Sequence, residues 1–204
     1  MKSRHRVKTY GEVFTPRHMV DQMLNLVREE LETGPDFLDK TFLEPAAGDG
    51  NFLVAILHRK LHAVGERYPR AEWEEASLFA VASIYGIELL EDNHREAKEA
   101  MLTEFVRFHA EHDVPCGLVT KLREAAIFLI DMNVVRGNTL TGLDWRGEEI
   151  QFSWWSRIME STGMVQRAPF TLASLRGDSF DFTVYTSYEP CRIDQVQEEM
   201  RADA

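Results

Sequence analysis

The segment "TFLEPAAGDGNFLV" at residues 41–54 constrains the fold more than any other part of the chain. A short apolar run at 41–43 is followed by Glu-Pro and by two glycines that flank Asp49, and apolar residues resume at Phe52. This pattern predicts a buried strand that turns directly into a helix. In open α/β proteins such a turn brings the free N–H groups of the helix to the carboxyl edge of the sheet, where ligands bind.

Short apolar runs alternate with amphipathic segments over the first two thirds of the chain. Thr15 before Pro16 is typical of a helix start, because a hydroxyl caps free amides and proline fits the first helical position. Strands that alternate with helices predict an α/β fold with a doubly wound, mostly parallel sheet and helices on both faces. The expected helices are 17–31, 51–63, 71–83, 91–112 and 118–131. The expected strands are 41–43, 84–89 and a third strand that with its turn spans 133–140.

The character of the chain changes after Asp144. The segments 149–155 and 181–188 are rich in aromatic and β-branched residues and predict strands at an antiparallel edge of the same sheet. Residues 159–170 between them have the composition of a loop, and 193–204 of a short helix. We therefore expect a basic arm followed by one domain. The boundaries are 1–10 for the arm and 11–204 for the domain, which divides into a cofactor half, 11–144, and a strand-rich part, 145–204.

Two tryptophans in the strand-rich part have two possible roles. Trp154 and Trp155 are adjacent, and neighbouring side chains on a strand point to opposite faces, so one of them should lie in the core. The other either contacts a partner or stacks on a base. The whole segment from Phe152 to Tyr188 either completes the sheet or forms a docking surface.

Composition excludes several classes of protein. Hydrophobic residues make up 44% of the 204 residues and charged residues 28%, which is ordinary for a globular domain with a core. The chain has no apolar run of about 18 residues and no apolar signal core, so we expect no membrane segment. Cys116 and Cys191 have neither metal-ligand nor disulfide-framework spacing, so we expect no metal site and a cytoplasmic protein.

The net charge of −11 argues against tight binding to nucleic acid by the chain alone, because neutralised phosphates drive such binding. Basic residues are concentrated at the start of the chain, at Lys2, Arg4, Arg6 and Lys8. This arm is either a frayed, solvated terminus or a weak phosphate-contacting arm for DNA.

The glycine loop lacks the signatures of two common nucleotide sites. It has no Gly-Lys-Ser/Thr ending for a triphosphate and only two of the three glycines of a dinucleotide fingerprint. Glu44 and Asp49 instead put negative charge where a phosphate would lie. A ligand with a cationic head fits better, which indicates S-adenosylmethionine.

The next two predicted strands carry matching residues at their ends. Glu88 ends the second strand, where a carboxylate can accept hydrogen bonds from both ribose hydroxyls. Asn138 lies in the turn after the third strand, where its carboxamide can pair with adenine. Each signal is weak alone, but all three occur in order at successive carboxyl ends.

These motifs together resemble a known family. "GEVFTP" (11–16), "FLEPAAGDGNFL" (42–53), "YGIEL" (85–89) and "GNTL" (137–140) are similar to the cofactor-site motifs of adenine-specific, amino-group DNA methyltransferases, as in modification subunits of restriction systems. The resemblance implies a class I methyltransferase fold that binds S-adenosylmethionine. The implied cofactor-binding residues are Thr15, Pro16, Glu44, Pro45, Ala46, Gly48, Asp49, Gly50, Phe52, Glu88, Leu89 and Asn138.

The resemblance also implies an Asn/Asp-Pro-Pro-aromatic tetrad that orients the target amine and stacks on the flipped base. The chain has no such tetrad. The nearest candidates are Thr186, Ser187 and Tyr188 in "TSYEP", which lack the carboxamide and the proline-stiffened turn. Substitute acceptors would be Asn133, Asp178 or Asp181.

Two functions from different classes follow. The chain is either an S-adenosylmethionine-dependent DNA adenine methyltransferase, or a catalytically inactive methyltransferase-like subunit of a DNA-modifying complex. Either function calls for a protein partner or a second copy of the chain to hold DNA stably, since the basic arm alone offers few charges.

Overall fold

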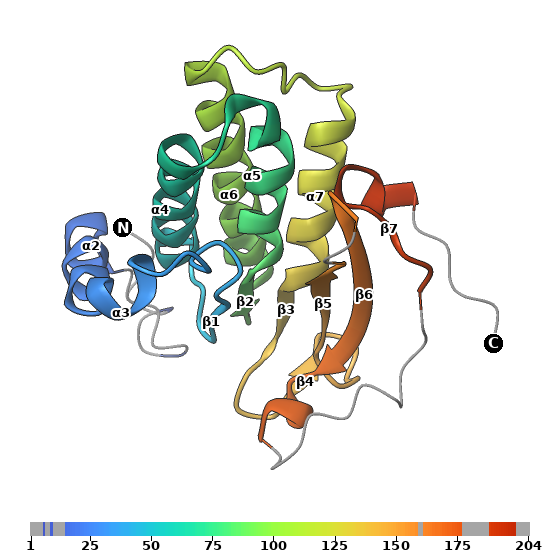
Figure 1. The fold of residues 1–204 in the computed structure, drawn as a ribbon. Helices are drawn as coiled ribbons and strands as arrows, with labels where there is room; N and C mark the ends of the chain where they lie inside the picture. The colour runs from blue at the N-terminus through green and yellow to red at the C-terminus, as the bar shows by residue number, and fades with distance from the viewer. Residues whose placement is uncertain (1–5, 7–8, 10–14, 159–160, 177–187, 199–204) are drawn as a thin grey trace.

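The computed structural model describes residues 6, 9, 15–158, 161–176 and 188–198, and its fold is drawn in Figure 1. The helices are α2 (Arg17–Leu26), α3 (Arg28–Glu32), α4 (Asn51–Arg67), α5 (Trp73–Ala82), α6 (Glu91–Glu111) and α7 (Lys121–Asn133), with 3-10 turns η1 (Arg70–Glu72), η2 (Ala173–Arg176) and η3 (Ile193–Glu198). The strands are β1 (Phe42–Glu44), β2 (Ile84–Glu88), β3 (Val134–Asn138), β4 (Leu143–Asp144), β5 (Gln151–Arg157), β6 (Met164–Thr171) and β7 (Cys191–Arg192). The protein is therefore a mixed α/β protein, as the sequence predicts.

The first sheet has the order β1-β2-β3-β4, and its first three strands are parallel. Glu44 of β1 lies beside Gly86, and Glu88 of β2 lies beside Arg136, so the three carboxyl ends meet at one edge of the sheet. The chain crosses from β1 to β2 through α4 and α5, and from β2 to β3 through α6 and α7. β4 pairs antiparallel with the end of β3.

The helices form a layer on one face of this sheet. Ile84 of β2 is fully buried in the main core together with side chains of α4, α5, α6 and α7, which stand side by side in Figure 1. Tyr85 and Ile87 point to the opposite face, where they pack against Phe152 and Phe170 of the second sheet. Burial on both faces explains why β2 is apolar almost throughout.

Our prediction of helices on both faces differs from this arrangement. Within the residues that the structure describes, the second face of the parallel strands is covered by an antiparallel sheet. The strands run in one direction from β1 to β3, so successive crossover helices fall on the same face.

The strand-rich part forms a separate three-stranded sheet in the order β5-β6-β7, and does not extend the first sheet as predicted. Residues 164–171 form β6, although the sequence predicts a loop over 164–170, and β6 pairs with β5 from Val165 onward. The loop-like composition of β6 includes Pro169, which this strand tolerates because β7 pairs only with its first two residues. The predicted strand 181–188 lies outside the described residues except for Tyr188.

The prediction that one tryptophan of the pair lies in the core is confirmed. Trp155 is buried against the helical layer, and its ring contacts Phe128 of α7. Trp154 points to the other face and is partly buried against Phe170. Both rings therefore serve packing between layers.

The first predicted helix is broken in two. α2 ends at Leu26 and α3 begins at Arg28, with Val27 between them at a non-helical ψ of 10°. Val20 and Leu24 are buried as the helical pattern predicts, but Met23 is half exposed.

In the part of the chain that the structure describes, no helix is long and apolar enough to cross a membrane.

Candidate functional site

The loop after β1 makes a tight turn and leads directly into α4. Gly48 and Gly50 have positive φ angles of 58° and 90°, a region that glycine adopts more readily than residues with a Cβ. Gly50 is the residue that precedes α4, and the amide of Ala47 donates to the carbonyl of Ile87 over 2.8 Å. The loop is thereby held against the end of β2, and the first amides of α4 lie at the carboxyl edge of the sheet.

Glu88 is the centre of this edge. Its side chain is buried, with 7% of the residue exposed. The amide of Gly48 donates to its Oε2 over 2.8 Å, and the amide of Leu90 donates to its Oε1 over 2.9 Å. Nδ2 of Asn93, in the first turn of α6, donates to the same Oε1 over 3.4 Å. The Glu88 carboxylate therefore links the glycine loop to the start of α6.

The turn after β3 reaches the same loop. Oγ1 of Thr139 donates to the carbonyl of Pro45 over 2.5 Å. Oδ1 of Asn138 accepts hydrogen bonds from the amides of Leu140 (2.9 Å) and Thr141 (3.4 Å), so its carboxamide closes the turn in which it lies. The loop, Glu88 and the Asn138 turn are thus brought together, as their order in the sequence predicts.

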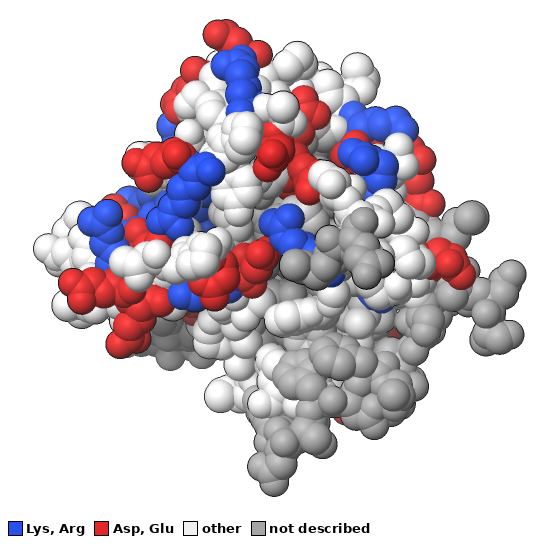
Figure 2. Space-filling model, viewed as in Figure 1, with Lys and Arg blue, Asp and Glu red and all other residues white. Residues whose placement is uncertain are grey.

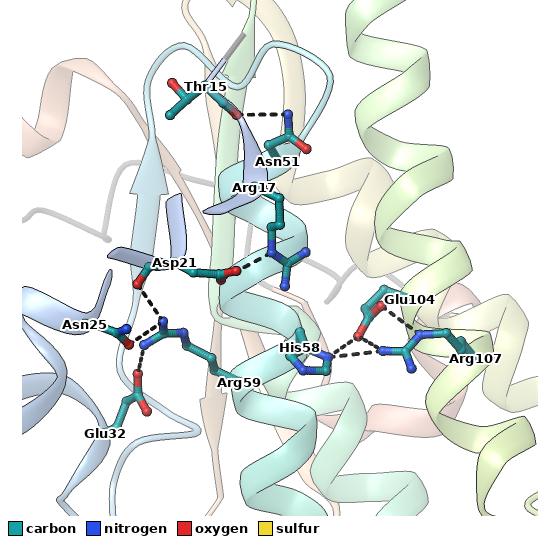
Figure 3. Close-up of polar contacts among 10 residues, drawn as sticks. All are labelled: Thr15, Arg17, Asp21, Asn25, Glu32, Asn51, His58, Arg59, Glu104 and Arg107. Carbon is teal, nitrogen blue, oxygen red and sulfur yellow. Dashed lines mark hydrogen bonds and ion pairs between the residues drawn. The ribbon is translucent and has the colours of Figure 1, made fainter. Parts of the chain in front are cut away.

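The start of α2 also lies at this edge, although it is far away in sequence. Nδ2 of Asn51, the first residue of α4, donates to the carbonyl of Thr15 over 3.2 Å (Figure 3). The predicted proximity of Thr15 to the glycine loop is therefore confirmed. The predicted hydroxyl cap is wrong: the residue that precedes α2 is Pro16, and no side chain caps the helix.

Arg59 of α4 holds the two upstream helices in place. Its guanidinium donates to the carbonyl of Asp21 (3.0 Å), to Oδ1 of Asn25 (2.8 Å) and to Oε1 of Glu32 (2.5 Å), as Figure 3 shows. One arginine therefore contacts both α2 and α3.

On the other side of α4, His58 lies 2.7 Å from Glu104 of α6. Burial raises the pKa of the Glu104 carboxyl, but hydrogen bonds from Arg107 and His58 outweigh this effect and lower the pKa.

The remaining predicted cofactor residues have simpler environments. Oε1 of Glu44 accepts a hydrogen bond from the amide of Ala46 over 3.0 Å, within its own turn. Phe52 packs partly buried against the main core, and Leu89 is 45% exposed beside Glu88. Asp49 is partly buried between the two loop glycines. The glycine loop is thus held mainly by hydrogen bonds from its backbone amides.

Arg6 of the basic arm lies at this site. Its guanidinium pairs with both carboxylate oxygens of Asp92 in the first turn of α6, at 2.5 and 3.0 Å. It also donates to Oδ1 of Asn93, the residue that contacts Glu88. The predicted DNA contact of Arg6 stays a prediction, and the Arg6 guanidinium forms an ion pair with Asp92 in this structure. Lys2, Arg4 and Lys8 lie outside the described residues.

Of the candidates for chemistry, the structure describes only Tyr188 and Asn133. Thr186, Ser187, Asp178 and Asp181 lie outside the described residues. Tyr188 packs under the guanidinium of Arg167, and no described contact joins it to Glu88 or the glycine loop. Asn133 is fully buried and its carboxamide pins β5 to the end of α5, donating to Ala82 and accepting from Ser153. Because Asn133 is fully buried, a substrate amine cannot reach its carboxamide.

Sequence reasoning missed three contributors to the site: Asn51, Asn93 and Thr139. Each is a polar residue in the turn that ends a predicted strand or in the first turn of a predicted helix. Such positions gather at the carboxyl edge of a parallel sheet, and this signal is present in the sequence.

Comparison of the chain with protein-family models, with curated proteins and with solved structures finds no match in any of the three.

Proposed function

We propose that this protein binds S-adenosylmethionine at the carboxyl edge of β1, β2 and β3, as a class I methyltransferase-like protein of the adenine-specific DNA-modifying type. The observation that carries the proposal is the convergence of three turns in sequence order. The Gly48 amide contacts Glu88, and the Thr139 hydroxyl contacts the loop at Pro45. The half of a doubly wound fold that binds adenosine has this order of strands.

The residues of the edge fit this cofactor in part. Each carboxylate oxygen accepts about two hydrogen bonds. Oε1 of Glu88 already accepts two, from Leu90 and Asn93, but Oε2 accepts one, from Gly48. One ribose hydroxyl therefore fits without rearrangement, and a second requires the Gly48 amide to move. Positive φ at Gly48 allows such movement at little cost.

Asn138 fits adenine as a donor. Both acceptor positions of its Oδ1 are used by the turn, and Nδ2 has no partner among the described residues. Nδ2 would donate to a ring nitrogen of adenine. The exposed side chain of Leu89 offers an apolar face for the ring. The cofactor would supply an activated methyl group, and these side chains would hold its adenosine part in one orientation.

Catalysis needs more than this edge. A catalytically inactive binding or regulatory subunit is the second candidate function, and two observations favour it. The sequence has no Asn/Asp-Pro-Pro-aromatic tetrad, and the carboxamide of Asn133 is fully buried between β5 and α5. Placement of a target amine in line with a methyl group is worth several orders of magnitude in rate. An active complex would then draw this placement from a partner chain.

The cofactor proposal is tested by calorimetric titration of S-adenosylmethionine into wild type and Glu88→Gln. We expect binding to wild type, weakened in the variant by about 1–3 kcal/mol because a charge-assisted acceptor is lost. Glu88 also accepts three hydrogen bonds from the protein, so the unfolding free energy of each protein is measured in parallel. Glu99→Gln on the exposed surface of α6 is the control and should bind like wild type.

Absence of binding by wild type at millimolar cofactor would refute the proposal and leave the loop a purely structural turn. A methyl-transfer assay on mixed DNA then separates the two functions. Turnover by the purified chain alone supports the enzyme. Cofactor binding without turnover supports the inactive subunit.

A further inference from the structure

A cavity that shares no lining residue with the proposed cofactor site lies beside β3. It has a volume of about 470 Å³ and lies between β3, the hairpin at 143–149 and the β5–β6 sheet. Its lining includes neither Glu88, Asn138 nor any residue of the glycine loop. The cavity is therefore separate from the three converging turns, and its volume lies in the range of small-ligand sites.

Two pairs of arginine and aromatic rings line this cavity. On the hairpin, the guanidinium carbon of Arg146 lies 4.7 Å from the ring centre of Trp145, which is 60% exposed. On the β6 side, the guanidinium carbon of Arg167 lies 4.3 Å from the ring centre of Tyr188. Flat cationic and aromatic surfaces thus come from two separate segments of the chain. All four residues line the cavity.

Three charged groups of the lining have partners within the protein, and the lining also includes the carboxylates of Glu148 and Glu149. Arg136 pairs with Glu91 at 2.9 Å and Asp131 pairs with Lys98 at 2.8 Å. Oδ1 of Asp144 accepts from the amides of residues 146 and 148.

Arg146 differs from these groups, because no carboxylate pairs with it in the part of the chain that the structure describes. Its guanidinium is thus available to an anionic ligand. Apolar atoms come from Ile150, Phe152 and Pro169.

We propose that this cavity binds a nucleobase together with its phosphate. A base is flat, stacks on aromatic rings and guanidinium planes, and carries ring acceptors for N–H donors. Trp145 and Tyr188 would provide the stacking surfaces, and Arg146 would pair with the phosphate. The base comes either from a free nucleotide or from a single-stranded nucleic acid. This inference goes beyond the proposed function, since it involves no residue of the cofactor edge.

The test is a titration followed by intrinsic tryptophan fluorescence and by calorimetry, at low salt and without S-adenosylmethionine. The probes are adenosine monophosphate and a single-stranded oligonucleotide of about eight nucleotides, a length within the site size of small single-strand binding domains. Binding of both indicates a nucleotide site. Binding of the oligonucleotide alone indicates a single-strand site, and either result supports the proposal.

Two variants and two controls locate the site. Trp145→Ala and Arg146→Gln change exposed side chains, so the fold should be kept. We expect affinity to fall about tenfold in Trp145→Ala, within the range for loss of one base stack. Leu118→Ala and Arg28→Gln, at exposed positions elsewhere, should bind like wild type.

The proposal is overturned if neither probe binds, or if the Trp145 and Leu118 variants lose affinity equally. Because cofactor is omitted, this outcome is independent of the cofactor titration. Failure of one therefore does not imply failure of the other.

Discussion

At the scale of single residues, Lys60 shows how this chain holds a buried charge without a carboxylate. The side chain is completely buried between α4 and the 37–40 turn. Its Nζ donates to the carbonyls of Phe37 (2.9 Å), Leu38 (2.7 Å) and Lys40 (2.7 Å) and to Oγ of Ser83 (2.7 Å). Burial lowers the pKa of Lys60 to about 7 from 10.5, partly opposed by the nearby charge of Asp39. The ammonium therefore links the chain before β1 to the turn before β2.

Lys60 should make stability depend on pH in an unusual direction. Its pKa is lower in the folded than in the unfolded state, so between about 7 and 10.5 the unfolded chain binds more protons. Stability should then rise with pH in this window, by at most about 1.4 kcal/mol per pH unit. Urea unfolding of wild type and Lys60→Met at neutral and alkaline pH should show this slope only in wild type. Lys121→Met, at an exposed position, is the control and should keep it.

Gly50 should be intolerant of any side chain for two separable reasons. At a φ of 90° an L residue is strained, and a Cβ there would lie 2.8 Å from the Cα of Ala97. Gly147 has almost the same φ, 89°, but open space around it. Gly147→Ala should therefore cost about 1 kcal/mol for strain alone, and Gly50→Ala at least about 1 kcal/mol more for the clash. Equal losses in thermal or urea unfolding would contradict the close approach of the start of α4 to α6.

At the scale of elements, the break at Val27 shows that tertiary contacts can divide a segment whose sequence pattern predicts one helix. The apolar spacing from Val20 to Leu31 fits one continuous helix, yet the chain turns at Val27. Arg59 binds to groups on both sides of this break, at Asn25 and Glu32. A straight helix would carry α3 away from α4 and lose these bonds.

Arg59→Ala should loosen α2 and α3 together. The change removes three hydrogen bonds from a side chain that is only 16% exposed, so we expect a loss of about 1–3 kcal/mol in unfolding free energy. Amide hydrogen exchange over 17–32 should accelerate more than exchange in α6. Arg28→Ala removes an exposed, longer ion pair to the same Glu32 and should change neither quantity much. Unchanged exchange in Arg59→Ala would show that α2 is held by its buried Val20 and Leu24 alone.

At the scale of the whole molecule, charge governs what the protein binds. Figure 2 shows Lys and Arg side chains interspersed with Asp and Glu over the helical part of one face, with a net charge of −11 for the chain. Arg6 is paired with Asp92, which leaves Lys2, Arg4 and Lys8 as the other cations of the arm. The arm therefore has little positive charge to offer to phosphate.

Duplex DNA should bind the isolated chain weakly at physiological salt of about 150 mM. Three phosphate contacts predict a slope of log K against log salt of roughly −2.7, measured by fluorescence anisotropy. Replacement of Lys2, Arg4 and Lys8 by Gln should abolish this binding. The substitution leaves Arg6 in place, because its deletion would also disturb Asp92 and Asn93 beside Glu88. Nanomolar affinity of the pure monomer at physiological salt would remove the need for a partner chain.

By itself the sequence determined the order of the helices and parallel strands, and the positions at which their turns meet. These features depend on local periodicity, on glycine and proline, and on the rule that parallel strands end at one edge. The sequence alone therefore predicted that Glu88, Asn138 and the glycine loop lie at one edge of the sheet. The α/β class followed from the same alternation.

Only the tertiary structure decided which partners these residues have. Glu88 binds the Gly48 amide from 40 positions away, Arg6 binds Asp92 from 86 positions away, and Tyr85 donates to Ser153 over 68 positions. β6 forms because β5 supplies its partners, and its own polar residues do not predict a strand. Such contacts depend on how whole layers pack, because packing sets the distance between segments that local patterns leave free.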